Sequence, residues 1–222
     1  MCLSPELDLA AGVVISAVAV DAIRHNLNNK SMPLALLPGV FAIHSFASAL
    51  VWFSFQDQIP TWLGDFATNL YIFIAFILLP IYVPITALLI EPNKFRKQIL
   101  TLFTIFGLIS GSTYAYYVLN GFGKVNECTY FLDFHVVGPP TLISALYGIA
   151  TCGALLFSSF KKLVFWAGLN CVAILILNIR LAHALPSLWC LWAALTSFYV
   201  SWFLRDLKKR GMNDKSLYFK TI

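Results

Sequence analysis

Long apolar runs dominate the chain, and short polar or proline-containing stretches separate them. A membrane-spanning helix needs about 20 mainly apolar residues, because it rises about 1.5 Å per residue across a hydrocarbon layer about 30 Å thick. The runs that meet or approach this length predict seven spans, over Leu7–Ile23, Pro33–Phe55, Phe66–Ile90, Ile99–Leu119, Pro139–Phe160, Leu163–Leu181 and Pro186–Leu204.

Helices are the expected form of these runs. Within lipid the backbone must satisfy its own hydrogen bonds, which leaves helices or closed barrels, and the runs lack the alternation of a barrel strand. Pro33, Pro139 and Pro186 stand at predicted first turns, where proline removes no helical hydrogen bond. Pro80 and Pro84 lie inside the third run, so we expect that helix to be bent or broken in its cytoplasmic half.

Composition excludes a soluble globule. Of the 222 residues, 59% are hydrophobic and 11% are charged, against roughly 25% charged residues in an ordinary soluble domain. Too few polar side chains exist to cover a water-facing surface. We predict an all-α, polytopic transmembrane helix bundle, with a seven-helix domain over residues 1–204 and a basic cytoplasmic tail over residues 205–222.

The basic residues predict the orientation of the chain. All but two of the 15 Lys and Arg residues lie in alternate loops or after the last run, and Lys124 and Arg180 are the exceptions. The positive-inside rule then places the N-terminus outside and the C-terminus in the cytoplasm of a plasma (inner) membrane protein. Because the net charge of +5 comes from short clusters between apolar runs, we expect no nucleic-acid partner.

Polar side chains inside the spans are the candidates for a functional site, because they are costly in lipid. His44 is the deepest, about halfway through its run. Pairing Asp8 with Arg180 would remove two unpaired charges near the outer face. The candidate polar site comprises His44, Ser48, Asp8, Arg180, His183 and Cys190.

These residues do not complete a known catalytic set. No H-x-x-x-H or H-E-x-x-H pair occurs, so we expect no metal; if one is present, His44 and His183 are its candidate ligands. The last run has no lysine for a retinal Schiff base, so no retinal is expected, and the cofactors are otherwise unknown. Our leading hypothesis is non-enzymatic binding or sensing of a small or lipidic molecule, or support of a membrane complex.

Two alternatives stay open. One is a metal-dependent intramembrane lipid hydrolase using His44 and His183 with Asp8 or Cys190, in which the metal would generate hydroxide. The other is a small-molecule transporter, in which the proline-interrupted third span would take part.

Besides the lipid bilayer, the sequence indicates one protein partner, a second copy of the chain. Gly107 and Gly111 form a G-x-x-x-G pattern that permits close helix approach, and a homodimer through them is a hypothesis. Cys2 and Cys128 both fall on the predicted outer side, and the sequence leaves open whether they form a disulfide.

Several short motifs extend over nearly the whole chain. It opens with Met1-Cys2-x-Ser4, and its last run carries Trp189-Cys190. The other motifs are Ala11-Gly12, Pro33-Leu34 with Pro38 and His44, Trp52, Pro80-x-Tyr82-Val83-Pro84, and Ala193-Ala194 with Ser197. Together they resemble an uncharacterised prokaryotic family of seven-span membrane proteins that opens with Met-Cys-x-Ser. In that family a glutamine and a glutamate often follow the histidine of the second span, where this chain has Ser45 and Ser48. The resemblance implies the topology and no established activity.

Overall fold

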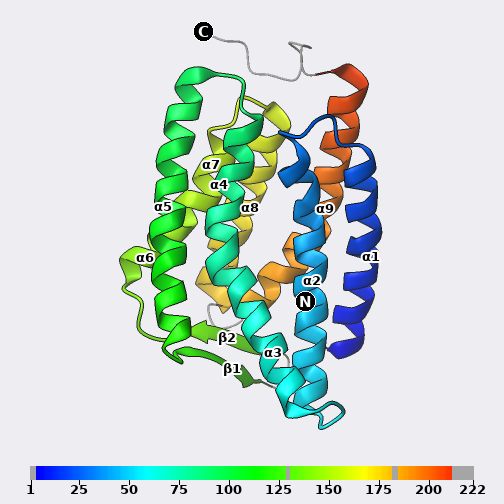
Figure 1. Ribbon diagram of the computed structural model, residues 1–222, viewed down its shortest axis with the longest axis vertical. Coiled ribbons are helices and arrows are strands. Elements are labelled where there is room, and N and C mark those ends of the chain that lie inside the picture. Colours follow the sequence, from blue (N-terminus) through cyan, green and yellow to red (C-terminus); the bar gives the residue numbers. More distant parts are fainter. Residues whose placement is uncertain (1–3, 129–130, 182–184, 212–222) are drawn as a thin grey trace.

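The computed structural model is a bundle of long helices that run roughly side by side (Figure 1). It describes residues 4–128, 131–181 and 185–211, without the side chains of residues 178–181, 185–191 and 193–195. The described helices are α1 (Pro5–Arg24), α2 (Met32–Phe55), α3 (Thr61–Ile72), η1 (Phe73–Leu78), α4 (Leu79–Ile90), α5 (Lys94–Leu119), α6 (Thr141–Gly148), η2 (Ile149–Gly153), α7 (Ala154–Leu156), α8 (Lys161–Leu181) and α9 (Leu185–Arg210), of which η1 and η2 are π-helical.

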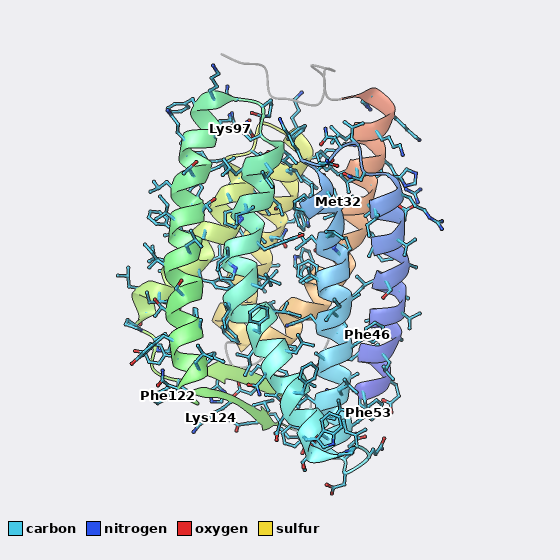
Figure 2. The ribbon with its side chains drawn as sticks, viewed as in Figure 1. Met32, Phe46, Phe53, Lys97, Phe122 and Lys124 are labelled. Atoms are coloured by element: carbon cyan, nitrogen blue, oxygen red, sulfur yellow. The ribbon has the colours of Figure 1, made fainter. Side chains whose placement is uncertain are left out.

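Three helices within the described residues are long and apolar enough to cross a membrane. They are Met32–Phe55, Thr61–Ile90 and Lys94–Leu119, and a shorter apolar helix covers Thr141–Leu156. They correspond to the second, third, fourth and fifth predicted spans. In α2, Met32 and Phe53 mark opposite ends of the bundle (Figure 2). The mostly helical fold is confirmed, whereas the full set of seven spans and their orientation stay predictions.

The helices extend beyond the predicted spans. The third begins at Thr61 instead of Phe66, and the fourth begins at Lys94 instead of Ile99. At Lys94 the helix starts because the Asn93 side chain accepts a hydrogen bond from the backbone N–H of Arg96 at 3.1 Å. Such a cap fixes a helix end by satisfying an otherwise unpaired backbone donor. Polar residues can therefore continue a helix past the apolar run that hydropathy detects.

The third helix is continuous in spite of its two prolines. α3, η1 and α4 follow one another without a break, and the irregularity is the π-helical turn of η1 just before Pro80. In this turn the N–H of Leu79 donates to the carbonyl of Ile74. If the π-helical pattern continued, the N–H of residue 80 would donate to the carbonyl of Ala75. Residue 80 is a proline and has no N–H, so this carbonyl needs another donor. The hydroxyl of Tyr147 donates to the Ala75 carbonyl at 2.8 Å instead.

Gly107 and Gly111 bring α5 unusually close to the third helix. A Cβ atom added at Gly107 would lie 1.9 Å from the carbonyl oxygen of Pro80, and one added at Gly111 would lie 2.8 Å from that of Ile77. The close approach expected from the G-x-x-x-G pattern thus occurs within the chain. A homodimer through these glycines stays a prediction, and it would have to compete with this intrachain contact.

A β-hairpin caps the bundle where α2 ends and α3 begins (Figure 1). Strands β1 (Gly123–Glu127) and β2 (Leu132–Val136) pair antiparallel, with Val125 opposite Phe134. Leu132 and Phe134 point inward and are 0% and 1% exposed. The prediction of an all-α bundle did not include this hairpin. Both strands are only five residues long, and the partners that bury Leu132 and Phe134 come from helices distant in sequence.

Candidate functional site

Asp8 and Ser48 meet between α1 and α2. Both side chains are 0% exposed, and the Ser48 hydroxyl donates to Oδ2 of Asp8 at 2.6 Å. α1 and α2 pack along each other, which carries Asp8, near the start of the first helix, to the second half of the next. A buried carboxylate is tolerated where hydrogen-bond donors surround it. The structure therefore joins two of the predicted site residues.

His44 lies one helical turn before Ser48 and is 3% exposed. Its ring stacks on Tyr71 of α3 with the centroids 3.8 Å apart, and Tyr71 stacks on Phe134 of β2 at 3.5 Å. The three stacked rings form a column from the hairpin to the middle of α2. Tyr71 and Phe134 are almost fully buried in it. This column closes one side of the polar cluster.

Trp52 lies one turn beyond Ser48, on the same side of α2. It packs in the cluster that contains Tyr71 and Phe134. Its side chain is 6% exposed, and its indole Nε1 is buried without a hydrogen-bond partner in the described part of the chain. We name Asp8, His44, Ser48, Trp52 and Tyr71 the outer polar cluster, after the side of the membrane that the sequence predicts for this end of the bundle. Sequence analysis placed neither Trp52 nor Tyr71 in the candidate site, because aromatic residues in an apolar run carry no signal that separates packing from binding.

The structure does not describe the side chains of the remaining predicted site residues. His183 is not described, and Arg180 and Cys190 are described only by the backbones of α8 and α9. The expected pairing of Asp8 with Arg180 is thus untested. Among the described residues, no group of three His, Cys, Asp or Glu residues could hold a metal ion. His44 and His183 remain candidate ligands without a described metal site.

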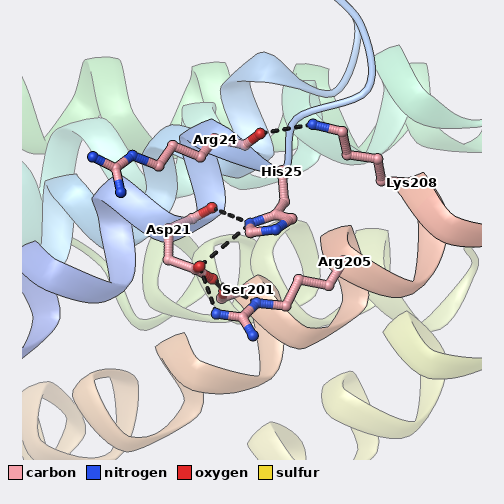
Figure 3. Close-up of polar contacts among 6 residues, drawn as sticks. All are labelled: Asp21, Arg24, His25, Ser201, Arg205 and Lys208. Atoms are coloured by element: carbon pink, nitrogen blue, oxygen red, sulfur yellow. Dashed lines mark hydrogen bonds and ion pairs between the residues drawn. The ribbon is translucent and has the colours of Figure 1, made fainter.

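A second polar cluster, at the opposite end of α1, contains Asp21, Ser201 and Arg205 (Figure 3). Arg205 donates to Asp21 through Nε at 2.8 Å and through Nη2 at 2.5 Å, and the Ser201 hydroxyl also donates to Asp21. Nδ1 of His25 lies 3.3 Å from the same carboxylate. This cluster ties α1 to α9. No local motif predicts it, because the partners are 184 residues apart in sequence.

Asp206 joins α8 to α9 at the same end. Lys162 Nζ lies 2.7 Å from Oδ2 of Asp206, and Arg210 Nε donates to Oδ1 at 2.8 Å. Burial favours the neutral acid, but the hydrogen bonds from Lys162 and Arg210 outweigh it and lower the pKa of Asp206 below its ordinary value of 3.8. The ammonium of Lys162 also lies 3.5 Å from the ring centre of Trp202.

Glu91 links the loop before α5 to the loop before α8. It is 1% exposed, and it accepts hydrogen bonds from the hydroxyl of Ser159 and, at 2.7 Å, from the N–H of the same residue. Arg96 reinforces this link by donating to the carbonyl of Ser158 at 2.8 Å. Sequence analysis assigned no role to Glu91. Its buried role depends on a loop that lies far along the chain.

No disulfide joins any two of the cysteines whose side chains are described. They are Cys128, Cys152 and Cys171. Cys2 lies outside the described residues, so the structure does not test a disulfide between Cys2 and Cys128.

No curated protein and no solved structure matches the chain. The prokaryotic origin, the seven spans and the motifs of the resemblance are therefore untested. Membership of an uncharacterised family is confirmed, because the model of the family described as "Family of unknown function (DUF6629)" matches residues 1–215 and the chain belongs to that family.

Proposed function

We propose that this protein is a multi-pass plasma-membrane protein of seven spans that binds a small or lipidic molecule at the outer polar cluster without catalysing a reaction. Support comes from the free-energy cost of burying the polar groups of this cluster. A hydrogen-bonded carboxylate, an imidazole and an indole N–H lie buried among apolar helices, and such groups inside a membrane bundle point to a ligand site.

The indole N–H of Trp52 carries the proposal. A buried donor without an acceptor costs about 1–3 kcal/mol, and the described part of the chain offers Nε1 of Trp52 none. A ligand with a carbonyl, ether or hydroxyl oxygen would remove this cost. The neighbouring Tyr71 and Phe134 rings add an apolar wall, and most ligand sites combine such walls with few polar groups.

The distribution of basic residues supports the proposed orientation. The pairs Asp21–Arg205 and Lys162–Asp206 and the contact of Arg96 with Ser158 gather the cationic loops at one end of the bundle. Lys97 lies at this end and Lys124 at the other (Figure 2). In our proposal the end with Lys97 faces the cytoplasm.

Cysteine accessibility tests the orientation. In a variant without the native cysteines, Lys124→Cys is expected to react with a membrane-impermeant maleimide in intact cells. Lys97→Cys is expected to react only after permeabilisation. The reverse pattern would overturn the proposed orientation, and labelling of both in intact cells would contradict a plasma-membrane protein with these two loops on opposite sides.

Identification of the co-purified ligand tests the function. We expect mass spectrometry of the detergent-purified protein to find a stoichiometric small molecule or lipid that Trp52→Phe loses. The control is Trp62→Phe, because Trp62 is 68% exposed and lies outside the cluster. Equal retention by both variants would remove Trp52 from the site, and the absence of any bound molecule in wild type would overturn the proposal.

Metal analysis of the same preparations separates binding from the hydrolase alternative. Wild type is compared with His44→Ala and His183→Ala after chelator-free purification. About one equivalent of zinc that either variant loses would favour a metal-dependent lipid hydrolase, because the metal would supply an activated water. Wild-type protein without metal is the result that our proposal expects.

A further inference from the structure

A groove runs between α1 and α9 on the outside of the bundle, where the two helices lie side by side (Figure 1). Its volume is about 580 Å³, within the range of about 300–1,000 Å³ that is usual for ligand sites. Its walls are mainly apolar, with Val13, Val14 and Ala17 on one side and Phe198 and Trp202 on the other. Val13 is 63% exposed and Phe198 is 52% exposed. In a bilayer these walls face lipid chains.

One end of the groove is polar. Asp21, Ser201 and Arg205 line it, and the pairing of Arg205 with Asp21 neutralises one charge of each sign. Lys208, almost one turn beyond Arg205, donates from Nζ to the carbonyl of Arg24 at 2.8 Å (Figure 3). Both Arg24 and Lys208 are exposed, and neither has an ion-pair partner in the described part of the chain. This end therefore carries excess positive charge.

We propose that the groove binds one anionic phospholipid of the cytoplasmic leaflet. An acyl chain lies along Val14, Ala17 and Phe198, and the phosphate lies at the end formed by Arg205 and Lys208. This site goes beyond the proposed ligand of the outer polar cluster, because it lies at the opposite end of α1 and uses none of the same residues.

Charge and depth both select this occupant. An acyl chain matches the apolar walls. The exposed ammonium of Lys208, beside the neutral Arg205–Asp21 ion pair, favours an anionic headgroup over a zwitterionic one. Anionic lipids are concentrated in the leaflet where basic residues gather. Trp202 lies between the apolar walls and the polar end of the groove, at the interfacial depth that tryptophan favours in membranes. The Lys162 ammonium lies 3.5 Å from the centre of its ring.

Native mass spectrometry of partly delipidated protein tests the proposal, with dioleoylphosphatidylglycerol and dioleoylphosphatidylcholine as probes. Ala17→Trp fills the groove without changing its charge, and Leu108→Trp is its control on an exposed face of α5. Lys208→Gln removes a cation from the groove end, and Lys94→Gln is its control at the first turn of α5. Size-exclusion profiles and unfolding temperatures show whether each variant is folded.

We expect wild type to retain one phosphatidylglycerol in preference to phosphatidylcholine. Ala17→Trp should lower this occupancy about tenfold, while Leu108→Trp leaves it unchanged. Lys208→Gln should lower the affinity for phosphatidylglycerol about fivefold, the effect of one cation near an anionic headgroup, while Lys94→Gln leaves it unchanged. Equal retention of the two lipids by wild type would overturn the anionic headgroup. Equal effects of the two tryptophan variants would overturn the groove itself.

Discussion

Replacement of Gly107 by alanine tests the close contact between α5 and the third helix. The added Cβ would lie 1.9 Å from the carbonyl oxygen and 2.8 Å from the carbonyl carbon of Pro80, whereas ordinary contact begins at 3.4 Å. The obstacle is backbone, which cannot rotate away as a side chain can. Pro84 has no N–H for this carbonyl, so the oxygen is free to lie against the Cα of Gly107, a contact of the kind that stabilises close helix pairs.

The expected cost follows from two opposing effects. Overpacking a well-packed core costs about 1–3 kcal/mol, while alanine in place of a helical glycine gains about 0.5–1 kcal/mol. Gly168→Ala is the matched control, because Gly168 lies inside α8 and a Cβ there meets nothing within 4 Å. The propensity gain is common to both variants. The difference between them therefore isolates the clash, at about 1–3 kcal/mol.

Thermal unfolding in detergent, followed by thiol-reactive fluorescence, measures this difference. For a chain of this size, each kcal/mol corresponds to about 2–4 °C in Tm. We expect Gly107→Ala to unfold below wild type and Gly168→Ala to unfold at or above it. If Gly107→Ala were as stable as Gly168→Ala, α5 would not approach Pro80 as described, and the assignment of these glycines to an intrachain contact would be refuted.

The remaining predictions concern polar contacts. Glu91→Gln should lower the free energy of unfolding by about 1.5–3 kcal/mol, the value of hydrogen bonds to a charged group, whereas the exposed Glu127→Gln should have little effect; equal effects in urea unfolding would contradict the buried link. Tyr147→Phe should cost about 1–3 kcal/mol, because the Ala75 carbonyl loses its donor; an unchanged Tm would show that water replaces the hydroxyl. The pKa of Asp206 is lower in the folded protein than its unfolded value of about 3.9. Its ion pair therefore stabilises the fold fully above about pH 3.9, and this stabilisation is lost as the pH falls through the lower, folded pKa. The Tm difference between wild type and Asp206→Asn should therefore persist from neutral pH to about pH 4 and shrink below it; its disappearance already near pH 6 would refute this account.

The sequence by itself determined the helical character of the chain. Hydropathy is a local sum over about 20 residues, and it located the helices Met32–Phe55, Thr61–Ile90 and Lys94–Leu119 to within a few residues at each end. It did not predict the β-hairpin, because strands β1 and β2 are far shorter than the window over which hydropathy is summed. The inward positions of Leu132 and Phe134 become visible only with their helical partners in place.

The candidate site was predicted in part. Costly polar residues in an apolar chain stand out, which identified Asp8, His44 and Ser48 without showing which of them meet. The structure decided that Ser48 bonds Asp8 and that Tyr71 stacks on His44. Helix rotation controls these contacts, and in a bundle with apolar residues on every side the sequence carries little rotational signal.

Tertiary structure alone decided the long-range links. Asp21 meets Arg205 across 184 residues, and the G-x-x-x-G face of α5 packs on the carbonyl of Pro80 within the chain. The sequence showed that Gly107 permits close approach, but not to which surface. Whether a segment spans the membrane depends on the free energy of transferring that segment into lipid. These contacts depend instead on which helix surfaces pack together, and side-chain shape and hydrogen bonding between segments distant in sequence decide that.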